Sequence, residues 1–509
     1  MRPQTDGGVN ERREQWRDAH VLVVGLGLSG LAAARSLVAL GARVTGIDTR
    51  PHVAEAAAAE LGAAARVLAA RQDEQSLIAE ALARGPRVAI VSPGIPPRSP
   101  LVAAPRAAGL AILTEFDLAW LIRADNAPWF FVTGTNGKTT TAQMTSALLQ
   151  AAGLHAPPLG NMGVAMTTVA LEGIADEAGT VRPPQAWPVE IAALQLHDTT
   201  YPEPQAGICL NVAEDHLDHF GTMAAYRAAK AKVYQHARGA CVYPEWEDGA
   251  RAMVEEADVT EGAIAVGLSL AAPRIGQIGV VEGLVVDRAY YARRQREALE
   301  LFGVEDLRHL AIGDTVPPHV LTNAMAAAAL VRSVDLEPEA ITAGLRGFRL
   351  DAHRIATVAS HQGVSWVDDS KATNAHAAEA SMRQLAAGTC VWVAGGDAKG
   401  ADLEDLVRRQ ADRLRAVVLI GKDPSPWSGP LSRHASAIPV IEVPDGDTTE
   451  VMRAAVAAAH AHARPGDTVL LAPAGASWDQ FRSYAHRGEA FAQAVLARLS
   501  DAQGPPEVS

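Results

Sequence analysis

The chain has 509 residues, which at roughly 150 residues per domain predicts about three domains. Hydrophobic residues make up 48% and charged residues 20% of the sequence, and no stretch approaches the ~18 uninterrupted apolar residues of a membrane span, so a largely disordered chain and a membrane-embedded one are excluded. Lysine and arginine number 45 against 58 aspartates and glutamates, and the resulting net charge of −13 repels phosphodiester backbones, so nucleic acid is not an expected partner.

The amino terminus and the three cysteines indicate where the protein resides. Residues 1–18 are highly charged and lack the apolar segment of a signal peptide, so they predict a disordered leader. Cys209, Cys241 and Cys390 lack the spacing of zinc ligands and are interpreted as buried thiols. We therefore expect a cytoplasmic protein without a membrane partner.

Short β-rich runs alternate with alanine-rich helical segments along the whole chain, which predicts an α/β fold with parallel sheets. We place the domains at residues 19–126, 127–350 and 351–509. In the first domain, a strand at Val21–Val24 runs into a glycine-rich turn and a helix, and a second strand ends at Asp48. Gly25, Gly27 and Gly30 fit a dinucleotide fingerprint with Asp48 positioned for a ribose hydroxyl, so nucleotide binding of some kind is expected.

A second glycine-rich loop begins the central domain. The strand Trp129–Thr133 follows a candidate linker at 123–128 and leads into Thr-Gly-Thr-Asn-Gly-Lys-Thr-Thr at 133–140, with a helix predicted to start near Thr141. Backbone N–H groups of such a loop cradle phosphates, Lys138 can neutralise them, and the Thr139 hydroxyl can bind Mg²⁺. The loop is therefore a candidate site for a nucleoside triphosphate.

Further polar residues follow other strands of the central domain. Glu190 lies in a strand predicted at Val189–Leu194, and both Glu190 and His216 are candidate Mg²⁺ ligands. The alternative is that His216 and His219 are ordinary helix-cap residues. Lys230 is predicted on a helix, where a lysine is by default a solvated cation; only a desolvated, neutral amine can act as a base or take up CO₂ as a carbamate.

The third domain carries polar clusters after several predicted strands. The strand Val364–Val367 leads into Asp-Asp-Ser-Lys-Ala-Thr-Asn at 368–374, and similar clusters follow at 395–400 and 473–477. The cations and hydroxyls of these clusters suit a small carboxylate substrate. They are Arg354, Lys371, Lys399, Ser370, Thr373 and Ser477.

Together these residues resemble the Mur ligase family, and within it the enzymes that add D-glutamate to UDP-N-acetylmuramoyl-L-alanine. The resemblance extends from about Val21 to Ala497 and rests on the order and spacing of several segments. These are 134–140, 211–216, 369–374, Ser477-Trp-Asp-Gln-Phe481 and Arg487-Gly488. The fold it implies has a Rossmann-like amino-terminal domain, a central P-loop-type ATPase domain and a Rossmann-like carboxyl-terminal domain.

The resemblance also implies a role for individual residues. UDP of the first substrate would be held by Leu28, Ser29, Asp48, Thr49, Arg50, Ser92, Pro93 and Gly94, with Asn161 near the muramoyl group. ATP would be bound by Gly134, Asn136, Gly137, Lys138, Thr139, Thr140, Asn323, Arg354 and Asp369. Two Mg²⁺ ions would be held by Thr139, Glu190, His216 and a carbamylated Lys230. D-Glutamate would be held by Thr373, Lys399, Ser477 and Tyr484, with Lys371 close to the phosphoryl group in transfer.

The implied reaction is a two-step amide synthesis by a monomer. The alanyl carboxylate attacks the γ-phosphate of ATP, and the amine of D-glutamate then displaces phosphate from the acyl phosphate, releasing ADP and phosphate. Positioning and charge neutralisation supply most of such catalysis, and Lys138, His216, Lys230 and Lys371 would be the catalytic groups. Closure of the third domain over the second would keep water from the acyl phosphate.

Departures from the family pattern leave alternatives open. Ala192 and Ala193 replace two serines, Leu194 replaces a phenylalanine, Val320 replaces an asparagine, and Ala352 replaces a frequent proline. A sibling ligase with another amino acid or acceptor, including one of folylpolyglutamate type, is the nearest alternative. A weakened UDP-sugar-binding paralogue and an NAD-dependent oxidoreductase are the others, and the last would leave Lys138 and Thr139 without a role.

Overall fold

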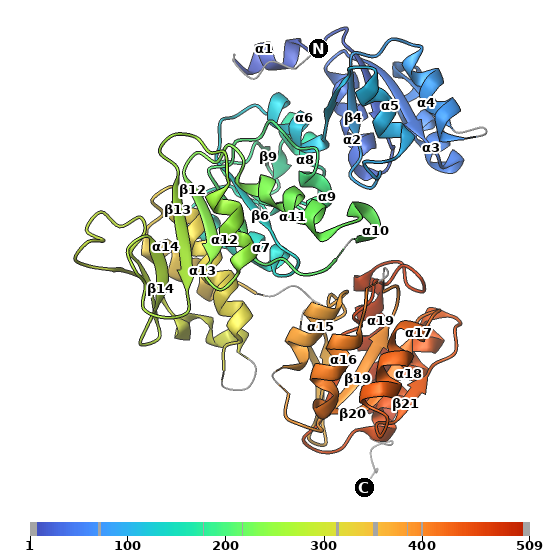
Figure 1. The fold of residues 1–509 in the computed structure, drawn as a ribbon, viewed down its shortest axis with the longest axis vertical. Helices are drawn as coiled ribbons and strands as arrows, with labels where there is room; N and C mark the ends of the chain where they lie inside the picture. The colour runs from blue at the N-terminus through green and yellow to red at the C-terminus, as the bar shows by residue number, and fades with distance from the viewer. Residues whose placement is uncertain are drawn as a thin grey trace. The chain divides into compact units, whose positions relative to one another are not determined.

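We analysed a computed structural model of the chain, which describes residues 8–69, 73–176, 178–215, 217–311, 315–349, 355–383, 385–398 and 401–501. The chain forms two compact units, residues 1–212 with 219–348 and residues 213–218 with 349–509. The described residues form three large sheets, and the colour ramp of Figure 1 separates them along the chain. The predicted α/β fold with mostly parallel sheets is confirmed.

The first sheet has five parallel strands in the order β3-β2-β1-β4-β5. Chain order reverses between β1 and β4, and in such sheets ligands bind beyond the carboxyl ends of the strands at that point. The elements are β1 (His20–Val24), α2 (Leu28–Ala39), β2 (Arg43–Asp48), α3 (Pro51–Leu61), β3 (Ala65–Ala69), α4 (Glu74–Leu82), β4 (Val88–Val91), α5 (Pro100–Ala107), β5 (Ala111–Leu113) and α6 (Glu115–Ile122).

The predicted disordered leader is wrong for residues 8–18, while residues 1–7 lie outside the described part. These residues contain helix α1 (Val9–Glu14), and the side chain of Trp16 is 2% exposed in the core. Arg13 donates from Nε to the carbonyl of Ile122 at 2.7 Å and from Nη2 to that of Ala170 at 3.1 Å. Both carbonyls lie at the carboxyl ends of helices, where a positive charge is stabilising. Arg13 therefore caps two helices and does not belong to a solvated, disordered tail.

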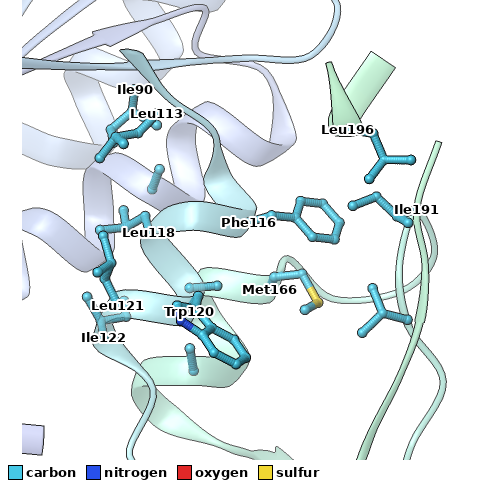
Figure 2. Packing of buried hydrophobic residues seen from close by; sticks show 14 of the residues in the cluster. Ile90, Leu113, Phe116, Leu118, Trp120, Leu121, Ile122, Met166, Ile191 and Leu196 are labelled. Atoms are coloured by element: carbon cyan, nitrogen blue, oxygen red, sulfur yellow. The ribbon is translucent and has the colours of Figure 1, made fainter. Parts of the chain in front are cut away.

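Helix α6 joins the first sheet to the second. All eight of its residues are buried, six of them apolar and two of them the acids Glu115 and Asp117. Figure 2 shows Phe116 pointing toward Ile191 and Leu196 of the central domain, while Leu118 lies on the side of Ile90. The first two sheets therefore share one hydrophobic core within one unit.

The second sheet has nine strands in the order β16-β15-β14-β13-β12-β11-β6-β10-β7, parallel except for the hairpins β14–β15 and β15–β16. Its strands are β6 (Trp129–Thr133), β7 (Leu159–Gly160), β10 (Trp187–Glu190), β11 (Ala206–Cys209), β12 (Ala240–Pro244), β13 (Ile264–Ser269), β14 (Gln277–Val281), β15 (Leu284–Asp287) and β16 (Leu299–Gly303). Its helices are α7 (Lys138–Ala151), α8 (Met166–Glu172), α9 (Ala193–Leu196), α10 (Leu217–Phe220), α11 (Met223–Ala231), α12 (Asp248–Glu255), α13 (Pro318–Arg332) and α14 (Pro338–Gly347). A separate small hairpin pairs β8 (Ile174–Ala175) with β9 (Val181–Arg182).

Two predicted boundaries in this sheet are wrong. The strand predicted to continue to Leu194 ends at Glu190, because Gln195 accepts the backbone N–H of Ala192 at 2.8 Å and caps the short helix α9. The helix predicted to start near Thr141 starts at Lys138, since Gly137 adopts a left-handed conformation with φ of 85° and ends the loop there.

The third sheet, in the carboxyl-terminal unit, has the order β17-β18-β22-β19-β20-β21. Its strands are parallel except that β17 pairs antiparallel with β18. Its elements are β17 (Ala356–His361), β18 (Val364–Asp368), α15 (Ala375–Met382), β19 (Cys390–Gly395), α16 (Glu404–Gln410), β20 (Leu414–Ile420), α17 (Ser425–His434), β21 (Val440–Glu442), α18 (Thr448–His462), β22 (Thr468–Leu471) and α19 (Tyr484–Asp501). Polar residues that follow β18, β19 and β22 therefore meet at one edge, because the carboxyl ends of parallel strands lie together.

The predicted character of the cysteines is confirmed, since Cys209, Cys241 and Cys390 are buried free thiols. Burial raises the pKa of Cys209 to about 11 and the pKa of each of the other two to about 12, so all three are protonated at neutral pH. In the described ranges, no helix has both the length and the apolar character needed to cross a membrane.

Candidate active site

A cavity of about 490 Å³ opens at the carboxyl ends of β1, β2 and β4. All eight residues predicted to hold UDP in this domain line it, namely Leu28, Ser29, Asp48, Thr49, Arg50, Ser92, Pro93 and Gly94. The sequence did not single out several further lining residues, which come from the loop after β4 and from the starts of α4 and α5. They include Glu74, Ile95, Pro96, Ser99 and Leu101.

The carboxylate of Asp48 is occupied by protein donors. Its Oδ1 accepts the backbone and Nε protons of Arg50, both at 2.9 Å, and its Oδ2 accepts the backbone N–H of Leu26 at 2.8 Å and Nη2 of Arg50 at 2.9 Å. Burial raises the pKa of Asp48, but these hydrogen bonds outweigh it, so the pKa lies below its ordinary value. Four acceptor positions are filled. Asp48 thus orients the guanidinium of Arg50 in the cavity, and its contact with a ribose hydroxyl stays a prediction.

The predicted phosphate-binding loop lies between β6 and α7, and the segment that follows the neighbouring strand β11 holds it in place. Thr135 donates its backbone N–H to the carbonyl of Asn211 at 3.0 Å. The side-chain amide of Asn211 accepts the backbone N–H of Asn136 at 2.8 Å and donates to the Asn136 carbonyl at 3.1 Å. The sequence pattern marks Asn211 only as part of the segment 211–216, and its contacts with Asn136 and Thr135 are evident only in the structure.

The predicted ATP-binding residues of the loop occupy the first turn of α7 and the residues before it. Lys138 donates from Nζ to the carbonyls of Gly134 at 2.9 Å and of Thr135 at 3.0 Å. Thr139 is half-buried and Thr140 is buried, both directly after Lys138 at the start of the helix. The amino end of α7 therefore presents backbone N–H groups and a lysine together, as an anion-binding loop requires.

Helix α13 brings the predicted residue Asn323 beside this loop. A β-carbon at Gly137 would lie 2.8 Å from Oδ1 of Asn323, so only glycine fits there. Val320, where the family pattern has an asparagine, is 2% exposed and lies in the first turn of the same helix.

Glu190 and Asn161 lie together at the ends of β10 and β7. Asn161 donates from Nδ2 to Oε1 of Glu190 at 3.2 Å and from its backbone N–H to the Glu190 carbonyl at 2.9 Å. The other carboxylate oxygen, Oε2, is buried and has no hydrogen-bond partner among the described residues. An oxygen left in this state fits a hard cation such as Mg²⁺, which binds oxygen donors.

Lys230 is buried, so the default of a solvated surface cation is wrong for it. Its side chain is 1% exposed on α11, and Nζ lies 4.7 Å from the ring centre of Tyr226. The hydroxyl of Tyr226 lies 3.4 Å from Oγ1 of Thr135, so the same helix reaches the phosphate-binding loop. His216 lies outside the described residues, and no group of three histidine, cysteine or acidic side chains that could hold a metal occurs within them. Mg²⁺ commonly takes only one or two protein carboxylates, with water and phosphate completing its shell.

The predicted amino-acid site belongs to the carboxyl-terminal unit. Nζ of Lys371 lies 5.4 Å from the ring centre of Tyr484, and Ser370 between β18 and α15 donates its hydroxyl to the Tyr484 carbonyl at 2.8 Å. Asp369 accepts the Ser381 hydroxyl. The structure therefore brings Lys371 and Tyr484 together. Thr373 is half-buried and Ser477 is buried in the loops after β18 and β22. Arg354 and Lys399 lie outside the described residues.

Three family models match successive parts of the chain. They are the "Mur ligase MurD-like, N-terminal domain" at residues 19–114, the "Mur ligase middle domain" at 132–331 and the "Mur ligase, glutamate ligase domain" at 353–475. The UDP-N-acetylmuramoylalanine–D-glutamate ligase of Leifsonia xyli is 43% identical over 94% of this chain and 93% of its own, and that of Streptomyces avermitilis is 45% identical over 94% and 98%. The chain belongs to the Mur ligase family.

Solved structures of the Mur ligase family share the fold at low sequence identity. A pseudomurein peptide ligase type C from Methanothermus fervidus superposes with a TM-score of 0.53 at 15% identity, covering 94% of this chain and 100% of that one. The UDP-N-acetylmuramate–alanine ligase of Thermotoga maritima superposes with a TM-score of 0.52 at 15% identity, covering 95% and 99%. As a Mur ligase, this chain is an ATP-dependent ligase of peptidoglycan-precursor assembly.

Proposed function

We propose that this Mur ligase adds D-glutamate to UDP-N-acetylmuramoyl-L-alanine with formation of ADP and phosphate. The observation that carries the proposal is that one unit holds both a cavity at the ends of β1, β2 and β4 and a glycine-rich loop with Lys138 after β6, two separate candidate nucleotide sites. An NAD-dependent oxidoreductase would leave the second site without a role, and a simple ATPase would leave the first without one. The near-full-length similarity to ligases of this name supports the choice of substrates.

The first site would bind the uridine nucleotide of the acceptor. Helix α2 begins at Leu28 directly after the turn at Gly25 and Gly27, so its free N–H groups are available to the diphosphate. The guanidinium of Arg50, fixed by Asp48, adds a positive charge, and the 93% exposed side chain of Leu28 offers an apolar surface to the base. Asn161 would contact the muramoyl group.

The second site would bind the phosphates of ATP. The backbone from Gly134 to Thr140 and the ammonium of Lys138 would hold the β- and γ-phosphates, with Asn323 alongside. Thr139, Glu190, His216 and a carbamylated Lys230 would hold two Mg²⁺ ions, which neutralise phosphate charge when bound.

The carboxyl-terminal unit would bind D-glutamate through Thr373, Lys399, Ser477 and Tyr484. Lys371 would stabilise the negative charge of the phosphoryl group as the alanyl carboxylate becomes an acyl phosphate. The amine of D-glutamate then forms the amide bond, and phosphate leaves. One chain supplies every one of these groups, so we propose a monomer, and since ATP is consumed we place it in the cytoplasm.

Release of phosphate tests this proposal directly. Purified protein incubated with ATP, Mg²⁺, UDP-N-acetylmuramoyl-L-alanine and D-glutamate should release phosphate only when all four are present. Replacing Lys138 with alanine should lower the rate by about a hundredfold or more, the usual effect of removing one preorganised charge donor.

Lys232→Ala is the matched control, because Lys232 also donates to two backbone carbonyls, those of His197 at 2.6 Å and Thr199 at 3.2 Å, but has no proposed role in catalysis. Its variant should keep the wild-type phosphate-release rate wherever it stays folded. Tight uridine-nucleotide binding without phosphate release in the wild-type protein would contradict the proposal and indicate a binding paralogue instead.

A further inference from the structure

The carboxyl-terminal unit contains a buried arginine that the proposed reaction does not use. Arg487 lies in the first turn of α19 and its side chain is 1% exposed. In the sequence it is noticed only as part of the resemblance at Arg487-Gly488. A fully buried arginine is rare in proteins unless its charge and donors serve a purpose.

The guanidinium of Arg487 donates hydrogen bonds to groups at the carboxyl ends of three strands. After β18, it donates from Nε to the hydroxyl of Ser370 at 3.0 Å and from Nη2 to the Ser370 carbonyl at 2.9 Å. After β22, both Nη1 and Nη2 donate to the carbonyl of Gly475 at 3.1 Å. At the end of β19, Nη1 reaches the carbonyl of Gly395 at 3.5 Å. One side chain thus fixes the spacing of the loops that follow β18 and β22.

The backbone around the guanidinium leaves room for it and for little else. A β-carbon at Gly396 would lie 3.1 Å from Nη1 of Arg487 and 2.3 Å from the Ala476 carbonyl. The loops after β19 and β22 are also joined directly, because Asp397 and Ala476 exchange two backbone hydrogen bonds of 2.8 Å. This strand-end cluster of Arg487, Ser370, Gly395, Gly396 and Gly475 is therefore closely packed around one cation.

The charge of Arg487 is not neutralised by direct contact. In the part of the chain that the structure describes, its hydrogen bonds go to carbonyls and one hydroxyl, and Asp479 and Asp368 act on it only through space. Burial lowers its pKa to about 10, which still leaves the side chain protonated at neutral pH. A buried cation without a direct ion pair is costly even when two carboxylates act on it from a distance, so an anion bound nearby would recover part of that cost.

The residues proposed to bind D-glutamate lie next to the carbonyls that Arg487 holds. Thr373 is three residues beyond Ser370, and Ser477 is two residues beyond Gly475. Tyr484 begins the helix that carries Arg487, and its carbonyl accepts the Ser370 hydroxyl at 2.8 Å. A dicarboxylate bound by these residues would lie at the same sheet edge as the buried cation.

We propose that Arg487 is a positioning residue of the amino-acid site. It fixes the loops that carry Thr373 and Ser477, and its buried positive charge stabilises the bound carboxylates of the substrate without direct contact. This inference rests on the proposed function, because it assigns the substrate of the carboxyl-terminal unit. Two properties of Arg487 can be tested separately, the hydrogen-bond donors of its guanidinium and its positive charge.

Steady-state kinetics of Arg487→Lys and Arg487→Gln test both properties. The lysine variant keeps the positive charge but loses the planar set of guanidinium donors, while the glutamine variant loses both. We expect KM for D-glutamate to rise about tenfold or more in Arg487→Gln and by less in Arg487→Lys, with KM for ATP and for the UDP substrate close to wild type.

The matched control is Arg413→Gln, since Arg413 lies in the same unit at the amino end of β20 and donates from Nη1 to the Leu385 carbonyl at 2.6 Å. It should leave KM for D-glutamate unchanged. Thermal unfolding of all variants is measured alongside. Equal losses in the two Arg487 variants that follow their loss of melting temperature and affect all three substrates would reduce Arg487 to a structural clamp and overturn the proposal. A wild-type KM for D-glutamate in Arg487→Gln would overturn it as well.

Failure of the proposed function has a different outcome. A wild-type protein that joins a different amino acid to its acceptor would refute the choice of D-glutamate, and the comparison of lysine and glutamine variants is then made with that amino acid. The α-carboxylate is common to all amino acids, so the charge dependence is still expected. Its absence there would refute the role of Arg487.

Discussion

Asn211 connects the phosphate-binding loop to the strand beside it. Its side-chain amide pairs with both the N–H and the carbonyl of Asn136, and its own carbonyl accepts the N–H of Thr135. A loop that must bind phosphate keeps its N–H groups in one arrangement before the ligand arrives, and this preorganisation lowers the entropy lost on binding. We infer that Asn211 supplies it here.

Replacing Asn211 with alanine should raise KM for ATP about tenfold, because two hydrogen bonds to the loop are lost while the backbone contact to Thr135 remains. Initial rates at varied ATP measure this effect. Gln205→Ala is the control, since Gln205 precedes β11 at its other end and donates to the Ser333 carbonyl at 2.9 Å. An unchanged KM for ATP in Asn211→Ala would show that the loop is preorganised without the amide.

Helix α6 illustrates how an element can be positioned by buried acids. Asp117 accepts the backbone N–H groups of Thr114, Thr200 and Tyr201, each at 2.8 Å. Glu115 accepts the backbone N–H of Thr167 at 2.7 Å and its hydroxyl at 3.1 Å, at the amino end of α8. These bonds tie a helix that follows the first sheet to two segments of the central domain.

The Glu115 carboxyl predicts a pH dependence of stability. Burial raises its pKa from 4.5 to about 7, although the bonds from Thr167 partly oppose this. The folded state then holds the proton more tightly than the unfolded state between these values, so the free energy of unfolding falls as pH rises through this window, by about 3 kcal/mol in total. Above pH 7 the loss is complete.

Glu115→Gln should remove this part of the pH dependence. Urea unfolding of the first unit between pH 5 and pH 8 should show a smaller fall in stability for the variant than for wild type, whatever its absolute stability. Glu80→Gln, an exposed acid on α4, should keep the wild-type slope. Parallel pH profiles for wild type and Glu115→Gln would contradict a raised pKa at this position.

At the scale of the whole molecule, the hydrophobic cores divide the chain unevenly. The first two sheets share a core that includes α6 and Trp16, whereas the carboxyl-terminal unit has cores of its own on the two faces of its sheet. Elements that share a core unfold together, so the first two sheets should behave as one cooperative unit although they carry two separate candidate nucleotide sites.

Calorimetry in the presence of uridine diphosphate tests this division. The ligand should raise only the transition that contains both of the first two sheets, because its cavity is lined by that unit alone. At a concentration of about 100 times Kd the stabilisation should be about 2.7 kcal/mol. Arg50→Ala should reduce the shift, while the melting of the carboxyl-terminal unit serves as the internal control. A shift of both transitions, or separate melting of the first two sheets, would contradict the prediction that these sheets form one cooperative unit.

The sequence by itself determined the fold class and most of the strands. The strand Trp129–Thr133 begins and ends where its apolar run predicts, and the strands predicted at Val21–Val24 and Val364–Val367 are each one residue longer in the structure. Such runs are local signals, since each is bounded by residues that end a strand wherever the chain goes next. The glycines of the two candidate nucleotide loops are local signals for the same reason, and both loops follow strand ends as predicted.

Only the tertiary structure decided which charged residues are buried. The segment predicted as a disordered leader places Trp16 in the core, and Lys230 is buried beside Tyr226. The carboxylate of Asp48 accepts hydrogen bonds from Arg50. Burial of a polar side chain depends on partners that are distant in sequence, and 117 residues separate Arg487 from Ser370. No local pattern carries that information, because the free energy of a buried charge is set by the groups that the fold assembles around it.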